Sequence, residues 1–195
     1  MARLICLRLL DRAPRTRAQL AAALHRKGVP DEAAEVVLER FTDVGLIDDE
    51  AFAEAWVSSR HRGRGLAGRA LRQELTQRGV AQETVSAVVA GLDPDTERQT
   101  ARELVRRRAG RLAGLAPDVA ARRLVGMLAR KGYPPGLAYA VVQEALSESV
   151  SESVSVEARG SVFGQEPGVG QHQMPLPSVA SPGSDLSPAG AIGHR

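Results

Sequence analysis

Arginine is the residue type whose number and spacing in this sequence could support binding chemistry. It supplies nearly all of the positive charge, because Lys27 and Lys131 are the only lysines. Two stretches, residues 60–72 and 102–111, are dense in arginine. A guanidinium group binds phosphate or carboxylate through two parallel hydrogen bonds. We therefore predict contacts with a nucleic-acid backbone or an acidic protein surface, although a solvated helix face would have the same composition. The candidate contact residues are Arg60, Arg62, Arg64, Arg69, Arg72, Arg106, Arg107, Arg108 and Arg111.

The other reactive residue types form no catalytic or metal-binding pattern. Residues 48–50 are adjacent carboxylates, but they lie where a helix is expected to begin, and N-capping explains them without a metal. His25 and His61 have no partner at ligand spacing, and Cys6, the only cysteine, stands among apolar residues. We therefore expect neither an enzyme nor a bound metal or cofactor.

The elements that must position the arginines are indicated by a pattern that occurs three times. The segments Leu20–Gly28, Leu71–Gly79 and Leu124–Gly132 all read Leu-x3-Leu-x2-[Lys/Arg]-Gly. Leucines four residues apart share one helix face, and glycine readily adopts the left-handed conformation just beyond a helix end. The next residue is apolar in every copy, as in a Schellman helix end. Three copies at intervals of about 50 residues predict a repeat architecture.

Start signals around these segments divide each repeat into three helices. We predict an all-α fold of three tandem three-helix repeats. Repeat one spans residues 1–46, repeat two spans residues 47–92 and repeat three spans residues 93–146. A unit of this size buries little core alone, so the copies must pack against one another or against a partner.

Repeat two carries three local expectations. Phe52 and Trp56 are expected in its core. The segment Arg60–Gly65 is rich in arginine and glycine and is expected to form a loop. The glycines in this loop, Gly63 and Gly65, would let a partner approach the backbone closely.

The composition changes after Leu146, where the last helix is expected to end. Of residues 147–195, 22 are glycine, proline or serine, and we predict a disordered tail. Residues 1–146 carry 24 basic and 18 acidic side chains, whereas the tail carries two and five. No apolar run approaches the roughly 20 residues that span a bilayer, so we expect a cytoplasmic protein without membrane contact. We also expect a monomer.

One longer pattern is shared with a known family. It consists of Leu46-Ile47-Asp48-Asp49-x-x-Phe52-Ala53-x-x-Trp56-Val57-x-x-Arg60, then Gly65, then the Leu71–Gly79 helix end with Val80. This pattern resembles the central signature of the RecX family, the regulators of the RecA recombinase, and the resemblance extends over residues 2–146. It implies an elongated, curved array of three three-helix repeats and a role in homologous recombination, DNA repair and the SOS response. The implied function is non-enzymatic. Such a protein binds the RecA filament on single-stranded DNA and inhibits ATP hydrolysis, strand exchange and co-protease activity.

Two other functions are compatible with the helical pattern. A helix-turn-helix transcription factor has the same outline, but its recognition helix needs side chains that reach base edges. The third predicted helices of repeats two and three have no basic residue, so we expect only weak binding to single- or double-stranded DNA, without sequence specificity. Without the resemblance, a helical scaffold with no DNA-related partner would also fit.

Overall fold

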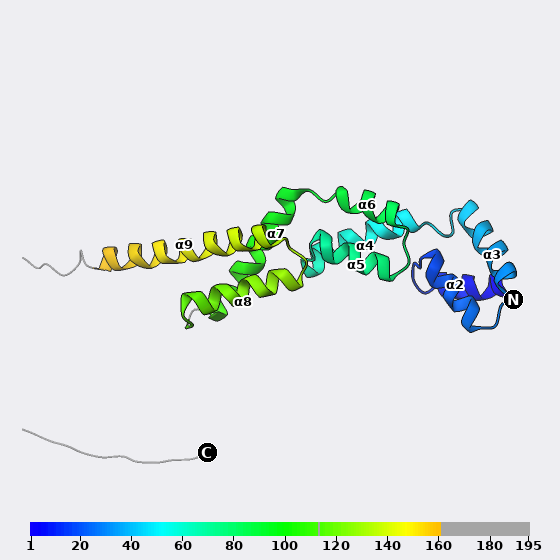
Figure 1. The fold of residues 1–195 in the computed structure, drawn as a ribbon, viewed down its shortest axis with the longest axis horizontal. Helices are drawn as coiled ribbons and strands as arrows, with labels where there is room; N and C mark the ends of the chain where they lie inside the picture. The colour runs from blue at the N-terminus through cyan, green and yellow to red at the C-terminus, as the bar shows by residue number, and fades with distance from the viewer. Residues whose placement is uncertain (113, 161–195) are drawn as a thin grey trace, which may run out of the picture.

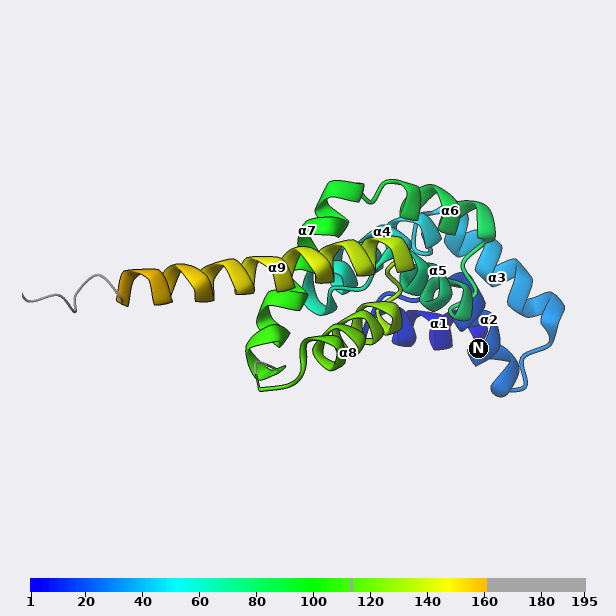
Figure 2. The ribbon, with the colours of Figure 1, turned by 60° about the vertical axis from the view of Figure 1, so that its left-hand side comes forward.

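The computed structural model describes residues 1–112 and 114–160, with side chains through residue 148. This part of the chain is helical throughout and contains nine α-helices and a short 3-10 helix, η1 (Gly110–Leu112). The α-helices are α1 (Ala2–Leu10), α2 (Arg17–Arg26) and α3 (Asp31–Asp43) in repeat one, α4 (Asp49–Arg64), α5 (Gly68–Gln77) and α6 (Gln82–Ala90) in repeat two, and α7 (Pro94–Ala109), α8 (Pro117–Arg130) and α9 (Pro135–Gly160) in repeat three. Figure 1 shows the three groups in a row, and in both Figure 1 and Figure 2 α9 projects beyond the last group. The predicted all-α fold is confirmed.

Each repeat has an apolar core of its own. The leucine pairs of the repeated pattern are fully buried in these cores: Leu20 and Leu24, Leu71 and Leu75, Leu124 and Leu128. A buried leucine contributes about 1.5–3 kcal/mol to folding, so each pair accounts for a large part of the stability of a small unit. The three cores are separate, except that Ile47 of repeat two joins the core of repeat one and Ala67 of repeat two joins the core of repeat three. The contacts that join the repeats must therefore be mostly of another kind.

The predicted helix ends are confirmed in all three repeats. Gly28, Gly79 and Gly132 have φ of 72°, 77° and 90°. The amide of each following residue donates to the carbonyl oxygen of the second leucine in the pattern: Val29 to Leu24 (3.2 Å), Val80 to Leu75 (3.2 Å) and Tyr133 to Leu128 (3.1 Å). This is the Schellman arrangement, which satisfies carbonyl groups that have no partner within their own helix.

Helix starts also follow the sequence signals. Thr16 and Gln19 form a capping box at α2, and Asp48 Oδ1 accepts a hydrogen bond from the Ala51 amide at the start of α4 (2.8 Å). Over the described residues, no three His, Cys, Asp or Glu side chains gather as metal ligands would. Among the same residues, no helix has both the length and the apolar character needed to cross a bilayer.

Repeats one and two meet at a joint built on Gly79, the glycine that ends α5. A Cβ at this position would lie 2.3 Å from the Cβ of Ala18, in the first turn of α2. Two hydrogen bonds flank this contact. The Thr16 hydroxyl donates to the Arg78 carbonyl oxygen (2.6 Å), and the Arg17 amide donates to Asp49 Oδ1 (2.8 Å). A carboxylate of repeat two thereby satisfies an amide at the start of α2 that has no acceptor in its own helix.

The contact between repeats two and three has the same construction. A Cβ on Gly132, at the end of α8, would lie 2.5 Å from the Ala70 amide nitrogen in the first turn of α5. The Ala67 amide donates to the Lys131 carbonyl oxygen (2.9 Å), and the Gly68 amide donates to Glu97 Oε1 (2.8 Å). We call this set of contacts, a helix-end glycine against the second helix of the preceding repeat, the inter-repeat joint. Its glycine is required both by the helix end and by the close approach.

The two ends of the array differ from its middle. Gly28 has the same backbone conformation as the joint glycines, but a Cβ there would meet no atom within 4 Å. At the other end, α8 begins with Pro117, which has no amide hydrogen to donate to a further carboxylate. The terminal repeats therefore each have one half of the inter-repeat joint, as expected of capping repeats.

Two predicted element boundaries are wrong. Arg60–Gly65 is not a loop, because α4 continues through Arg64 and ends at Gly65, with φ 60°. Hydrogen bonds from other side chains to the end of this helix, described below, offset the poor helix propensity of Gly63. The last helix does not end near Leu146 but continues to Gly160. The predicted disorder of residues 161–195 lies outside the described residues.

Candidate partner-binding surface

A cleft of about 670 Å³ lies where α4 ends against α7, at the junction of repeats two and three. Its walls include Arg62 and Arg64 from α4, Arg107 and Glu103 from α7, and Lys131 from the end of α8. We call it the junction cleft. It brings together residues from the two arginine-rich stretches, which are about 40 positions apart in the sequence.

The C-terminal end of α4 is fixed by three side chains. Lys131 donates through Nζ to the Arg64 carbonyl oxygen, the Tyr133 hydroxyl donates to the Gly65 carbonyl oxygen (3.1 Å), and His61 Nδ1 contacts the Leu66 carbonyl oxygen at 2.9 Å. Because a carbonyl oxygen only accepts, the His61 Nδ1 atom carries the proton. The positive charge of Lys131 at the C-terminus of α4 also interacts favourably with the helix dipole. Repeat three therefore holds the backbone that presents Arg62 and Arg64.

Positive charge dominates the junction cleft. Among its described lining residues, Glu103 is the one carboxylate beside four cations, and none of the four cations forms an ion pair. Burial lowers the pKa of Lys131, and the charges of Arg107 and Arg64 lower it further. Arg107 and Arg64 therefore lie close enough to Lys131 to repel it. An anionic group in the cleft would relieve this repulsion.

Arg60 lies in a different place from the other predicted residues of its stretch. Its guanidinium carbon is 4.0 Å from the centroid of the Trp56 ring, and its Nε is 3.6 Å from Glu74 Oε2. The guanidinium of Arg78 also lies over Trp56, at 3.6 Å, and Trp56 Nε1 donates to Glu74 Oε2 (2.8 Å). Cation–π contacts and a shared carboxylate thus engage Arg60 within repeat two. Trp56 is half-buried and packs on the side of the core instead of inside it.

The other five predicted arginines are exposed and lie outside the junction cleft. Arg69 and Arg72 lie on α5, Arg106 lies on α7 and Arg111 lies in η1. Arg108 lines a second basic hollow, between α7 and α8. The structure therefore brings together Arg62, Arg64 and Arg107 out of the nine candidates.

Sequence reasoning missed one cation of the cleft and misread one glycine. Lys131 precedes a helix-end glycine, so the sequence suggested only a role at the end of its own helix. The backbone at Gly65 does lie close to another segment, but that segment is α7 of this same chain and not a partner. A Cβ on Gly65 would lie 2.8 Å from Leu104 Cδ1, so this buried glycine serves the packing of repeat three and not contact with a partner.

Comparison with known proteins shows which protein family this chain resembles. Three family models match, described as the first, second and third three-helix domains of RecX, over residues 2–41, 48–89 and 95–142. A relative named "Regulatory protein RecX" in Thermobifida fusca (strain YX) is 60% identical over 156 residues, which cover 80% of this chain and 83% of the relative. A protein of the same name in Streptomyces coelicolor is 56% identical over 147 residues, which cover 75% of this chain and 78% of that protein.

Two solved structures share the fold. The crystal structure of RecX from Lactobacillus salivarius superposes with a TM-score of 0.69 at 16% identity, over 73% of this chain and 93% of that chain. A second crystal structure, of a regulatory protein RecX, superposes with a TM-score of 0.66 at 21% identity, over 73% of this chain and 70% of that chain. At these identities the two structures support the fold alone.

Proposed function

Because the chain belongs to the RecX family of regulatory proteins, which is not a family of enzymes, we propose that it binds the RecA filament on single-stranded DNA and inhibits RecA. The junction cleft is the contact surface in this proposal. Inhibition covers ATP hydrolysis, strand exchange and co-protease activity, because one protein bound along the filament would hinder all three.

The observation that carries the proposal is the set of four cations in the junction cleft that have no ion pair within the described residues. Arg62, Arg64, Arg107 and Lys131 come from three helices or helix ends and face one hollow. Holding like charges together is unfavourable unless an anionic partner binds, so the arrangement favours DNA phosphates or an acidic protein surface. Contacts of Lys131 and Tyr133 with the end of α4 hold the backbone that carries Arg62 and Arg64, and a rigid scaffold lowers the entropy cost of binding.

Sequence-specific DNA reading has no support in the arrangement of the helices. A recognition helix would present Arg, Lys, Asn or Gln to base edges. In repeat two the third helix, α6, reads QETVSAVVA and has no basic residue. The cations lie instead at the ends of α4 and α8 and on α7, as suits contact with a backbone or a carboxylate.

The test is single-stranded-DNA-dependent ATP hydrolysis by the RecA of the same organism, titrated with the full chain. The triple variant Arg62→Glu, Arg64→Glu, Arg107→Glu should weaken inhibition at least tenfold. Three lost exposed ionic contacts of about 0.5–1 kcal/mol each remove about 1.5–3 kcal/mol of binding free energy, and about 1.4 kcal/mol corresponds to a tenfold change in affinity. The matched control changes three exposed arginines of repeat one, with Arg8→Glu, Arg26→Glu and Arg40→Glu, and should inhibit as the unmodified chain does.

Two results would contradict the proposal. Equal inhibition by the triple variant and the control would remove the junction cleft from the mechanism. If the full chain does not inhibit ATP hydrolysis by RecA and binds one duplex DNA sequence more tightly than others, the helix-turn-helix alternative is favoured.

A further inference from the structure

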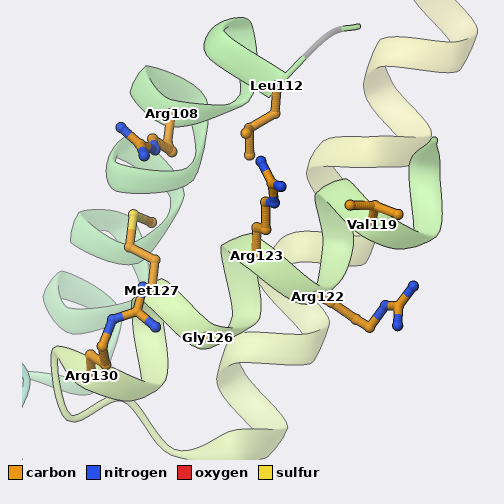
Figure 3. Close-up of a pocket in the computed structure, with 8 residues that line it drawn as sticks. All are labelled: Arg108, Leu112, Val119, Arg122, Arg123, Gly126, Met127 and Arg130. Carbon is orange, nitrogen blue, oxygen red and sulfur yellow. The ribbon is translucent and has the colours of Figure 1, made fainter. Parts of the chain in front are cut away.

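A second hollow, of about 840 Å³, lies between α7 and α8, away from the junction cleft. We call it the α7–α8 groove. Figure 3 shows Arg108 on α7 across from Arg123, Met127 and Arg130 on α8. Leu112 of η1 reaches in from one end, and Val119 lies at the start of the α8 wall. The groove thus has apolar side chains along its length and arginines at its edges.

The α8 wall is one continuous stripe. Arg123, Met127 and Arg130 follow the i, i+4, i+7 spacing, so they lie on the same helix face. Arg108, Arg123 and Arg130 are without an ionic partner in the described residues, whereas Arg122 pairs with Asp118 of its own helix (2.7 Å). No carboxylate is among the described residues that line the groove. The groove therefore complements a negatively charged ligand.

Gly126 is a second and independent sign of a ligand. It lies in the interior of α8, where glycine destabilises a helix by about 1 kcal/mol relative to alanine. Its backbone conformation does not require glycine, and a Cβ there would meet only the end of the flexible Arg130 side chain, at 3.4 Å. No contact within the described part of the chain thus accounts for this glycine. Its effect is to leave a notch between Arg123 and Met127, where another backbone can approach.

The chemistry of the groove distinguishes two classes of anionic ligand. Single-stranded nucleic acid is bound by basic residues together with aromatic side chains on which bases stack. The α7–α8 groove has no aromatic residue among its described lining residues; its apolar surface comes from leucine, valine and methionine. Methionine adapts to varied apolar side chains, and two packed helices commonly receive a third amphipathic helix.

We propose that the α7–α8 groove is a docking site for an acidic amphipathic helix of a partner protein. The apolar face of that helix lies on the part-exposed side chains of Val119 and Met127, beside the buried Leu112, and its carboxylates pair with Arg108, Arg123 and Arg130. The notch at Gly126 lets the backbone of that helix approach α8 closely. The site goes beyond the proposed function, because it would bind a helical protein segment whether or not the junction cleft contacts the filament.

The test is direct binding of a synthetic probe to the full chain, followed by fluorescence anisotropy. The probe is a labelled peptide of about 16 residues, long enough to form helix, with leucines on one face and glutamates flanking them. A scrambled peptide of the same composition keeps the charge and loses the apolar face. We expect the amphipathic peptide to bind at least tenfold more tightly than the scrambled one.

Three variants separate the groove from the rest of the molecule. The double variant Arg123→Glu, Arg130→Glu should weaken binding of the amphipathic peptide at least tenfold. Gly126→Leu should abolish binding by filling the notch while leaving the unfolding midpoint unchanged or raised, because leucine is the better helix former. The junction-cleft triple variant should bind the peptide as the unmodified chain does, so failure of the proposed function and failure of this inference are distinguishable.

Several outcomes would overturn the inference. Equal binding of the scrambled peptide, or full binding by Gly126→Leu, would reduce the groove to a non-specific basic surface. Displacement of the peptide by a dT oligonucleotide at lower concentration than by unlabelled peptide would assign the groove to nucleic acid. Self-association of the chain that Arg123→Glu, Arg130→Glu abolishes would assign the groove to a second copy of this chain.

Discussion

The inter-repeat joint makes a quantitative prediction, because the chain contains both a joint glycine and a matched glycine without a neighbour. Gly79→Ala would place a Cβ 2.3 Å from that of Ala18, whereas Gly28→Ala would place one in open space. Both positions have a positive φ, 77° and 72°. Gly28→Ala should therefore cost about 1 kcal/mol of unfolding free energy, from the backbone conformation alone. Gly79→Ala should cost about 2–4 kcal/mol, because overpacking adds about 1–3 kcal/mol.

A second substitution tests whether the added cost comes from the joint. Ala18→Gly removes the clashing Cβ and leaves the Ala18 Cα at 3.8 Å from the new Cβ, an ordinary contact. Alone, Ala18→Gly should cost about 0.5–1 kcal/mol from helix propensity. The double variant should then be about 1–3 kcal/mol more stable than the sum of the single effects predicts, which is a coupling energy in a double-mutant cycle.

The assay is chemical denaturation followed by two signals. Circular dichroism reports total helix, and Trp56 fluorescence reports the joint itself, because Trp56 is the only tryptophan and the Arg78 guanidinium lies 3.6 Å over its ring, next to Gly79. Equal costs for Gly28→Ala and Gly79→Ala, or additive effects in the cycle, would refute the argument that the glycine is required by the packing of two repeats.

Three further predictions concern single side chains. Tyr133→Phe should destabilise the fold by about 1–3 kcal/mol in denaturant titrations, because the Gly65 carbonyl oxygen loses its buried donor; Tyr139→Phe, at an exposed position, is the control and should change little. Hydrogen bonds from Thr96 lower the pKa of Asp93, so its stabilising effect should be present above the unfolded-state pKa of about 3.9 and be lost as pH falls through the folded value. Asp93→Ala should make the acid side of the stability–pH curve shallower, and an unchanged slope would contradict this assignment. Cys6 is fully buried, and burial raises the pKa of its thiol. Its labelling by a disulfide reagent should therefore be limited by the opening of repeat one, and labelling as fast as that of the unfolded chain would disprove this.

The fold was predictable from sequence wherever local chemistry determines it. The leucine spacing, the helix-end glycines and caps such as Thr16 act within about ten residues, so the pattern alone places them. The inter-repeat joint was not predictable in this way. Nothing near Gly79 in the sequence indicates that Ala18 lies against it, because that contact depends on how two folded repeats pack.

The candidate site was predictable only in part for a related reason. Arg60 and Arg62 are two residues apart, and in a helix such residues point in different directions. A loop over residues 60–65 offers no ground for separating Arg60, which stacks on Trp56, from Arg62, which faces the junction cleft. The α7–α8 groove was missed because its arginines 123 and 130 are interrupted by apolar residues and form a stripe only on the helix surface.

The division of the inter-repeat joint between the repeats also determines how a chain of this kind can lengthen. Repeat one contributes the receiving helix start, repeat three contributes the joint glycine, and among the described residues only repeat two contributes both. A gene duplication that copies repeat two in place would produce four units with every joint complete. A copy added after repeat three would meet Pro117, which has no hydrogen to donate at the start of its helix. Growth of the array is therefore favoured from its centre, and an engineered longer version should be built there.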